Sequence, residues 1–319
     1  MSVLTSQAII EKLFTLGHFH NPSAMTSVTL RDLPQLNLSD EATKVAIKSF
    51  QDFHIEQLER LAADRQGHVY PVVDGAVGPL TQALFKMERC GCPDYQVAGQ
   101  VAEATGNGSW VHSCNIQRPG IHVITVSVDK SRMPGFLAPV FESQVWELVT
   151  ASYADIGVIF ERRDGDSRAN IDFKWEKLRG STIGLAIVPG APMECSQRIW
   201  AKFTPTYQPG DVVNQWSRLV AHELGHNMRL QHTRGGIMNP SITSGPFVKT
   251  AWRNDPSYGV LKRYFGGEPV DLDGDAPEPE PPPKNDPPPN ESEYLVGPIQ
   301  HIRNGEVVGT YDLIPARRV

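Results

Sequence analysis

The chain has 319 residues, of which 40% are hydrophobic and 21% are charged, and its formal net charge is −6. This length exceeds one ordinary domain and allows two, each with its own core. No apolar run approaches the roughly 20 residues that cross a bilayer, and no basic block suggests a nucleic-acid partner, so both a membrane span and nucleic-acid binding are excluded.

Neither the N-terminal residues nor the cysteines identify a compartment. The opening stretch MSVLTSQAIIEKLFTLG lacks the basic region and the continuous apolar region of a secretory signal. The chain has four cysteines, which are too few and too irregularly spaced for a disulfide framework: Cys90, Cys92, Cys114 and Cys195. The localisation is therefore unknown from composition.

Three short helices are predicted in the first 95 residues. Apolar residues recur there at intervals of three or four in residues 6–17, 39–53 and 79–87. Ser39 is the expected N-cap of the second helix and Pro79 the expected first residue of the third. Directly after them, the stretch RCGCPD at 89–94 places two thiols close together.

From about residue 106 to residue 266 the pattern changes to mixed α and β. Residues 140–153 have a helical pattern, and a second helix is expected to begin near Asp211. Strands are predicted at 121–128, 157–163, 170–175, 184–190 and 198–203. The predicted fold class is therefore α+β.

The second helix carries residues with the spacing of metal ligands. His222 and His226 are four apart, so both imidazoles lie on one face and can reach one ion at about 2.0–2.1 Å. His232 follows too far along a straight helix, so the helix must end near residues 227–229. Three neutral imidazoles with an open fourth position favour one catalytic zinc ion, with Glu223 as general base. The alternative is a helix with three incidental histidines.

The last part of the chain has a different composition. Residues 268–293 hold nine prolines and nine acidic residues against one lysine, which predicts an extended linker. DLDGD within it does not complete a calcium loop, so calcium has no support. Two β-rich runs then flank Asn304-Gly305, a hairpin signal. One hairpin is not stable alone, so this tail is expected to dock on a domain or a partner.

The histidine spacing resembles the motif HExxHxxGxxH of the metzincin metallopeptidases, with Arg229 in the place of the glycine. That glycine takes a left-handed conformation, which costs a residue with a Cβ about 1–2 kcal/mol. The stretch GGIMNPS at 235–241 resembles the Met-turn of this clan, and its methionine, Met238, lies six residues after His232. Pro240 favours the matrixin branch. The resemblance also suggests residues 198–203 as an edge strand that binds extended substrate, although a core strand fits nearly as well.

The N-terminal region resembles a peptidoglycan-binding-like domain on the stretch VDGAVGPLT, and in matrixins that domain is the prodomain. RCGCPD resembles the matrixin cysteine switch PRCGVPD, matched at Arg89, Cys90, Gly91, Pro93 and Asp94. The resemblance implies that a Cys90 thiolate fills the open zinc position, with Arg89 and Asp94 as support. Two ordinary thiols at a domain end are the alternative, and Cys92 offers a second thiol that competes for the metal or oxidises with Cys90.

Together these patterns predict a small three-helix N-terminal domain followed by a metzincin-type domain with a twisted mixed sheet and an active-site helix. The expected divisions are a prodomain with the switch, a connecting segment, a catalytic domain, an acidic Pro-rich linker and a hairpin tail, at 1–95, 96–110, 111–266, 267–293 and 294–319.

The predicted function is that of a zinc-dependent endopeptidase made as a latent zymogen, which hydrolyses peptide bonds through a zinc-bound water with Glu223 as general base. The expected partner is a protein or peptide substrate, with peptidoglycan as a second candidate. The family resemblance implies an extracellular or cell-envelope location. The alternative function is a cell-wall (peptidoglycan) binding protein whose peptidase-like domain is not catalytic.

Overall fold

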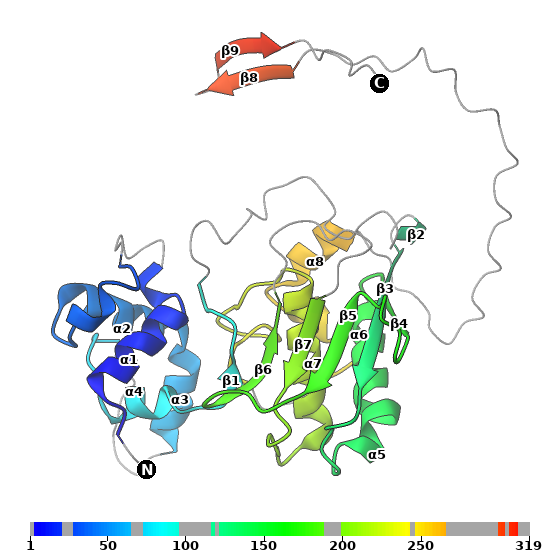
Figure 1. The fold of residues 1–319 in the computed structure, drawn as a ribbon, viewed down its shortest axis with the longest axis horizontal. Coiled ribbons are helices and arrows are strands. Elements are labelled where there is room, and N and C mark those ends of the chain that lie inside the picture. Colours follow the sequence, from blue (N-terminus) through cyan, green and yellow to red (C-terminus); the bar gives the residue numbers. More distant parts are fainter. Residues whose placement is uncertain are drawn as a thin grey trace, which may run out of the picture. The chain divides into compact units, whose positions relative to one another are not determined.

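The structure is a computed structural model, shown in Figure 1. It describes residues 3–20, 28–64, 73–95, 116–118, 121–187, 199–242, 246–265, 299–303 and 306–311. The chain divides into two compact units, Met1–Gly274 and Asp275–Val319. Among the helices in these ranges, none is both long enough and apolar enough to cross a membrane.

The N-terminal part of the first unit is a bundle of short helices. Its elements are α1 (Ser6–Thr15), η1 (His18–His20), η2 (Leu33–Gln35), α2 (Glu41–Phe53), α3 (Ile55–Ala63) and α4 (Pro79–Leu84). A core of buried apolar side chains holds them together, and the rings of Phe50 and Phe85 stack at its centre with centroids 4.2 Å apart.

The three helices predicted for this bundle are present as α1, α2 and α4, but a fourth helix was missed and one predicted N-cap was wrong. The missed helix, α3, follows α2 after a break at His54 that no glycine or proline marks. Asp40, not Ser39, is the N-cap of α2; the Ser39 hydroxyl donates to the side chain of Asn37 instead. Pro79 does begin α4, since a proline at this position loses no helical hydrogen bond.

The rest of the first unit is built on a seven-stranded mixed sheet. Its strands are β1 (Arg89–Cys90), β2 (Ile116–Arg118), β3 (Ile121–Asp129), β4 (Val158–Arg162), β5 (Ile171–Trp175), β6 (Thr182–Ala186) and β7 (Ile199–Phe203). They follow the order β1-β6-β7-β5-β3-β2, with β4 also beside β3. The five strands predicted between residues 121 and 203 are confirmed.

The interpretation of residues 198–203 as an edge strand was wrong. β7 pairs with β5 in parallel and with β6 antiparallel, so both of its edges are used. β6 lies outside it, and β1 pairs in parallel with the outer edge of β6. No pattern in the sequence predicts this order, because β1, which completes the sheet, lies about 90 residues before β6 in the chain.

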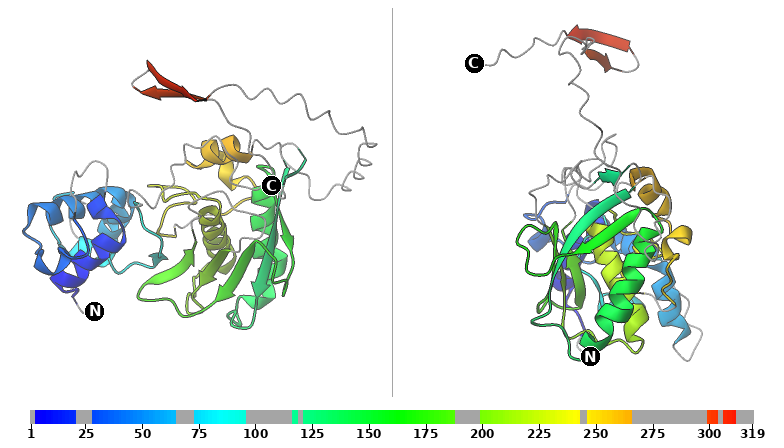
Figure 2. Two further views of the ribbon diagram at one scale, coloured as in Figure 1. Left: turned by 45° about the horizontal axis from the view of Figure 1, so that its top comes forward. Right: turned by 90° about the vertical axis from the view of Figure 1, so that its right-hand side faces the viewer.

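Two helical segments pack on one face of the sheet, as the right-hand view of Figure 2 shows. The first is continuous through α5 (Ala138–Val140), the π-helical segment η4 (Phe141–Trp146) and α6 (Glu147–Ala154), which confirms the helix predicted at 140–153. The second is α7 (Val212–Asn227). The Tyr153 hydroxyl of α6 donates to the Ala221 carbonyl of α7 at 2.7 Å, so the two helices are joined within the core.

The first unit closes with η5 (Ala251–Asn254) and α8 (Tyr258–Phe265). In the second unit, β8 (Ile299–Arg303) and β9 (Glu306–Tyr311) pair antiparallel, so the two predicted β runs are confirmed. The turn residues Asn304-Gly305, the predicted linker 267–293 and the predicted connecting segment 96–110 lie outside the described residues.

Candidate metal centre

Helix α7 positions two of the predicted metal-binding histidines. Its N-cap is Asp211, as expected, and the Asp211 side chain accepts the Asn214 backbone N–H at 3.2 Å. Trp216 and Leu224 anchor the helix in the sheet core. The spacing of four then places His222 and His226 on the same side, one turn apart, and both are buried.

The chain turns directly after this helix. α7 ends at Asn227, and Arg229 follows with φ of 65°, the one positive φ outside glycine in the described residues. Arg229 therefore takes the left-handed conformation that the motif requires at this position. The Leu230 N–H then donates to the Gly225 carbonyl at 2.9 Å, and the reversed chain brings His232 back to the helix.

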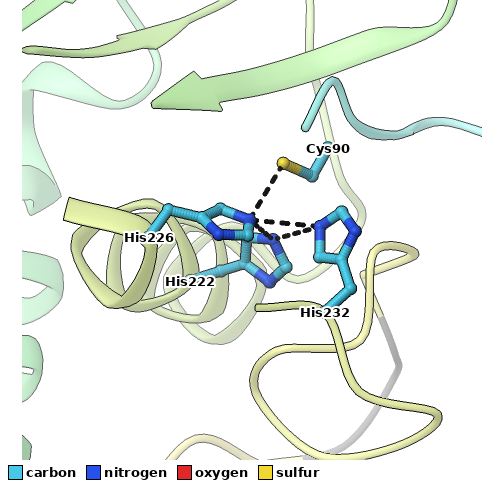
Figure 3. A group of neighbouring side chains, drawn as sticks. All are labelled: Cys90, His222, His226 and His232. Carbon is cyan, nitrogen blue, oxygen red and sulfur yellow. Dashed lines mark hydrogen bonds between the residues drawn. The ribbon is translucent and has the colours of Figure 1, made fainter. Parts of the chain in front are cut away.

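The three imidazoles face one another through their Nε2 atoms, as Figure 3 shows. Each Nδ1 lies against an oxygen: His222 against the Ile237 carbonyl at 2.7 Å, His226 against the Leu230 carbonyl at 2.8 Å, and His232 against Asp94 Oδ1 at 2.9 Å. These oxygens only accept, so each Nδ1 carries the hydrogen. The three Nε2 atoms lie 3.1–3.2 Å from one another, and in neutral rings their lone pairs point to one place.

This arrangement fits a tetrahedral zinc ion. With Zn–N distances of about 2.0–2.1 Å, two nitrogens around the ion lie about 3.3 Å apart, and a sulfur at about 2.3 Å lies about 3.6 Å from each nitrogen. The Sγ atom of Cys90 is 3.5 Å from Nε2 of His226. Cys90, His222, His226 and His232 are all buried, and their ligand atoms lie within 4.8 Å of one another.

Burial and neighbouring groups shift the pKa values of the three histidines in different directions. Burial lowers the pKa of His222 well below its ordinary value and lowers that of His232 to about 4. Burial also acts against His226, but the neighbouring Cys92 thiol and Glu223 raise the pKa of His226 to about 9. Burial thus keeps His222 and His232 neutral, which is the form that binds a metal ion, whereas the neighbouring Cys92 and Glu223 favour positive charge at His226.

Glu223 is buried beside the histidines. Neither carboxylate oxygen has a hydrogen-bond partner of normal geometry among the described residues. A ligand atom of Glu223 lies within 4.8 Å of both thiols and of the His226 ring nitrogen. Burial raises the pKa of Glu223 to about 8. A carboxyl group without a hydrogen-bond partner among the described residues thus lies close to the Cys90 sulfur, next to the histidine cluster.

Strand β6 approaches this carboxylate closely at Gly184. A Cβ added at Gly184 would stand 2.2 Å from Oε1 of Glu223 and 2.7 Å from Leu219 Cδ1. Only glycine allows that approach, so Gly184 helps to fix the position of Glu223. This role of Gly184 could not be predicted from the sequence, because a glycine within a strand carries no chemical signal of its own.

The segment with Met238 packs against helix α7 next to the histidine cluster. Met238 is fully buried, and a Cβ added at Gly225 would stand 2.5 Å from its sulfur, so the thioether packs directly against α7 between the two histidines. Asp255, which sequence reasoning missed, accepts the Ser257 N–H at 2.8 Å and also the N–H of Ile237, whose carbonyl holds His222.

The segment Arg89–Asp94, which is the predicted switch, lies against the cluster, and its first two residues form strand β1. The Cys90 N–H donates to the Pro240 carbonyl at 2.8 Å, and the Gly91 N–H donates to the Gly184 carbonyl at 2.9 Å. Cys90 is the thiol that groups with all three histidines, whereas the Cys92 sulfur donates to the Ala186 carbonyl at 3.4 Å. Burial raises the pKa of Cys90, while the hydrogen bond from Cys90 lowers that of Cys92.

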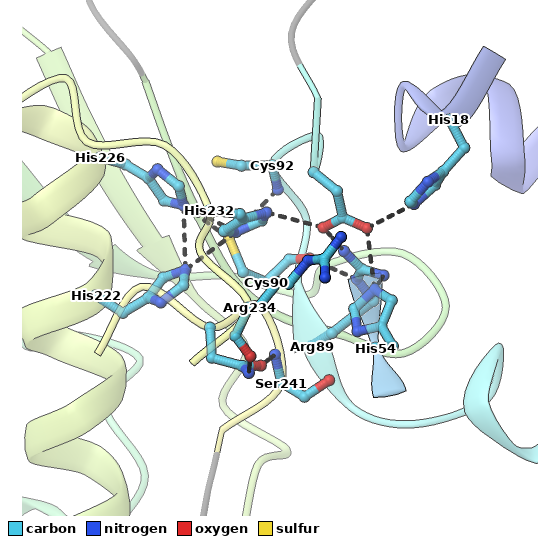
Figure 4. A network of polar contacts seen from close by, with 12 residues as sticks. His18, His54, Arg89, Cys90, Cys92, His222, His226, His232, Arg234 and Ser241 are labelled. Atoms are coloured by element: carbon cyan, nitrogen blue, oxygen red, sulfur yellow. Dashed lines mark hydrogen bonds and ion pairs between the residues drawn. The ribbon is translucent and has the colours of Figure 1, made fainter. Parts of the chain in front are cut away.

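Asp94 ends the switch segment and joins it to the helical bundle. His18, His54, Arg89 and His232 all contact its carboxylate, and Figure 4 shows these four side chains close together. Nε2 of His18 and of His54 donate to its Oδ2 at 2.9 and 3.0 Å, and Arg89 forms an ion pair with Oδ1. Burial acts to raise the pKa of Asp94, but Arg89 and His54 hold it well below the ordinary value.

Arg89 and Asp94 were predicted as support for the switch, whereas no role was predicted for His18 or His54. The structure brings all four residues together. No spacing pattern could have found the two histidines, because they lie 76 and 40 residues before Asp94. A second contact also joins the bundle to the Met238 loop: Gln57 Nε2 of α3 donates to Asn239 Oδ1 at 3.0 Å.

The fold and the site together are compatible with a metal-dependent enzyme. The long helix of a mixed α/β domain carries two of the three converging histidines, and a carboxyl group lies next to the fourth position. This arrangement of ligands fits a catalytic zinc site.

Comparison with protein families agrees with that class. Residues 140–233 match the model of the Metallo-peptidase family M12B Reprolysin-like. The matched residues include His222, Glu223, His226 and His232, and they end before Met238. The match supports a metallopeptidase domain of the metzincin type, and hence a peptide hydrolase. No curated protein matches the chain. The matrixin branch and the prodomain are outside what this match covers and stay predictions.

Proposed function

We propose that this chain is a zinc-dependent endopeptidase that its own N-terminal region holds latent through Cys90. The observation that carries the proposal is the convergence of three Nε2 lone pairs, 3.1–3.2 Å apart, with the Cys90 sulfur 3.5 Å from one of them. The metallopeptidase match over residues 140–233 favours this function over the cell-wall-binding alternative.

The three histidines would hold the ion through Nε2, while their Nδ1 hydrogen bonds keep the rings in orientation. When bound, zinc supplies a Lewis acid that polarises a peptide carbonyl and makes water nucleophilic near neutral pH. Glu223 would take the proton of the attacking water on a carboxylate oxygen and transfer it to the leaving amine. Its burial and its missing hydrogen-bond partner support this role.

Strand β6 is the strand that we propose for substrate binding. Its inner edge pairs with β7 and its outer edge with β1, the switch segment itself. If β1 leaves, the outer edge of β6 becomes free for an extended peptide, and Gly184 on that strand already lies against Glu223. This placement replaces the earlier expectation of residues 198–203, because β7 has no free edge.

Latency then follows from competition for one position. A thiolate is a soft ligand that zinc binds well, so Cys90 would exclude the water that reacts. Because Cys90 is part of the same chain, its effective concentration at the centre is in the millimolar range or above. A cut in the predicted connecting segment 96–110 would remove that tether.

The test uses the full chain with and without limited proteolysis, assayed for zinc content and for cleavage of a quenched fluorescent peptide mixture. We expect one zinc per chain, little cleavage before proteolysis and strong cleavage after it. Cys90→Ser is expected to be active without proteolysis, and the matched variant Cys92→Ser to stay latent. A chain that takes up no zinc, or a latent Cys90→Ser together with an active Cys92→Ser, would contradict the proposal as stated.

A further inference from the structure

His232 differs from the other two histidines in what holds its ring. The Nδ1 atoms of His222 and His226 donate to backbone carbonyls that lie 15 and 4 residues away in the same domain. The Nδ1 of His232 donates to a side chain, Asp94, which lies 138 residues earlier, at 2.9 Å. Both partners of that hydrogen bond are fully buried at their side chains.

Asp94 is anchored on the bundle side. Its backbone N–H donates to the Leu16 carbonyl at 2.9 Å, at the end of α1. Its Oδ2 accepts from His18 and His54, both of which belong to the bundle, and its Oδ1 is shared between Arg89 and His232. The orientation of His232 therefore depends on a group that leaves the site when the bundle leaves.

The three residues His18, His54 and Asp94 also group closely enough to suggest a second metal site. The ion pair of Arg89 with the same carboxylate argues against it, because the guanidinium already supplies the positive charge that a cation would bring. The two histidines lie at hydrogen-bond distances from Oδ2, 2.9 and 3.0 Å, and fix Asp94 as an acceptor. His18, His54 and Asp94 therefore form a hydrogen-bond network, and Asp94 connects this network to His232.

We infer that Asp94 is a positioning residue for His232, through which docking of the N-terminal bundle and metal binding stabilise each other. The inference rests on the metal site of the proposed function and adds a link that does not pass through Cys90. A carboxylate acceptor fixes the Nδ1–H tautomer, turns the Nε2 lone pair toward the other two rings and increases its basicity. By linkage, whatever this contact adds to metal affinity, bound metal adds equally to docking.

The link predicts that the metal affinity differs between the latent and the processed enzyme. In the docked state His232 has a charged acceptor. In the processed state its Nδ1 must find another acceptor or water, so the same three histidines bind zinc less tightly. Removal of the bundle would thus free the fourth position and loosen one of the three remaining ligands in one event.

The experiment isolates Asp94 from Cys90 by working in the full chain with Cys90→Ser, so that sulfur makes no contribution. The zinc dissociation constant is measured by competition with a chromophoric chelator, and the cobalt-substituted protein gives a visible spectrum that reports ligand geometry. Adding Asp94→Asn is expected to weaken zinc binding about 10- to 100-fold and to change the cobalt bands.

His54→Gln in the same background is the matched control. It removes a partner of Asp94 on the other carboxylate oxygen and leaves the contact with His232 in place. We expect its zinc affinity to stay close to that of the background. Equal losses in the Asp94 and His54 variants would overturn the inference, since they would mean that bundle packing alone matters. Unchanged affinity in both variants would overturn it as well.

A second measurement needs no change at Asp94. In the Cys90→Ser chain, zinc is expected to slow amide hydrogen exchange in α1 and α2, the helices next to Asp94. The same rates with zinc and with chelator would contradict the inference while leaving the peptidase proposal standing. If the Cys90→Ser chain takes up no zinc at all, the proposed function fails and this inference fails with it.

Discussion

Helix α7 and the switch segment Arg89–Asp94 build the same centre by different means. In α7 a spacing of four residues aligns two histidines, and their hydrogen-bond partners lie within 15 residues. The switch segment makes contacts that span 136 residues from Cys90 to His226 and 138 residues from Asp94 to His232. The α7 side depends on its own domain, whereas the switch side depends on docking of another region. Each side can therefore be altered while the other is kept.

The largest expected effect is the loss of peptide cleavage when Glu223, on helix α7, is replaced. Glu223→Gln in the Cys90→Ser chain should lower kcat/KM by about 10²–10⁴, because proton transfer is lost while the histidines are untouched. Zinc content, measured alongside, should equal that of Cys90→Ser alone. Loss of zinc in this variant would mean that Glu223 supports the metal site and does not act as a base.

Gly184→Ala tests whether strand β6 holds Glu223 in position. The added Cβ would meet Glu223 Oε1 and Leu219, which should displace the carboxylate and destabilise the domain by about 1–3 kcal/mol. We expect peptide cleavage in the Cys90→Ser background to fall well before zinc content does. Gly135→Ala is the control, since nothing lies within 4 Å of a Cβ at that position. If both variants behave alike, the close approach of β6 is not needed.

Acid should destabilise the fold through its buried histidines, at His18 and His54 on the switch side as well as at His222 and His232. The pKa of buried His54 is lowered to about 4, and burial also lowers that of His18, whereas both side chains have their ordinary values near 6.5 in the unfolded chain. The unfolded chain thus binds more protons between about pH 6.5 and 4, and the free energy of unfolding should fall across that window as pH falls, on the order of 3 kcal/mol for His54 alone.

Denaturant unfolding followed at several pH values would measure this loss. Asp94 stays ionised throughout the window, because Arg89 and its histidine neighbours hold its pKa well below the ordinary value, so its own protonation is not the cause. His54→Gln should flatten the dependence. A wild-type stability that is constant from pH 6.5 to 4 would show that the histidine charge is not excluded by burial.

How much the sequence predicts follows the same division. The helix, its end near residue 227 and the return of His232 can be predicted, because they follow from short spacings and local backbone chemistry. The parallel pairing of β1 with β6, and the contacts of His18 and His54 with Asp94, join residues 40 to about 95 positions apart, where no period links the partners. Helix α3 was missed for a local reason: no breaker residue separates it from α2.

The smallest expected effect concerns the turn after α7. Arg229 holds a left-handed conformation that costs about 1–2 kcal/mol for a residue with a Cβ, and glycine avoids this cost but loses more entropy on folding, about 0.5–1 kcal/mol. Arg229→Gly should therefore keep zinc binding and change the free energy of unfolding by no more than about 1 kcal/mol, because the backbone gain is offset by the loss of what the Arg229 side chain contacts. A clear loss of stability would show that the Arg229 side chain makes a contact that outweighs the backbone term.

The most direct test of the central claim, that three histidines and the Cys90 sulfur share one zinc ion, is X-ray absorption at the zinc edge of the intact chain. The account predicts three nitrogens at about 2.0–2.1 Å and one sulfur at about 2.3 Å, with the sulfur lost in Cys90→Ser and kept in Cys92→Ser. A zinc shell without sulfur in the intact chain, or a sulfur that persists in Cys90→Ser, would contradict it.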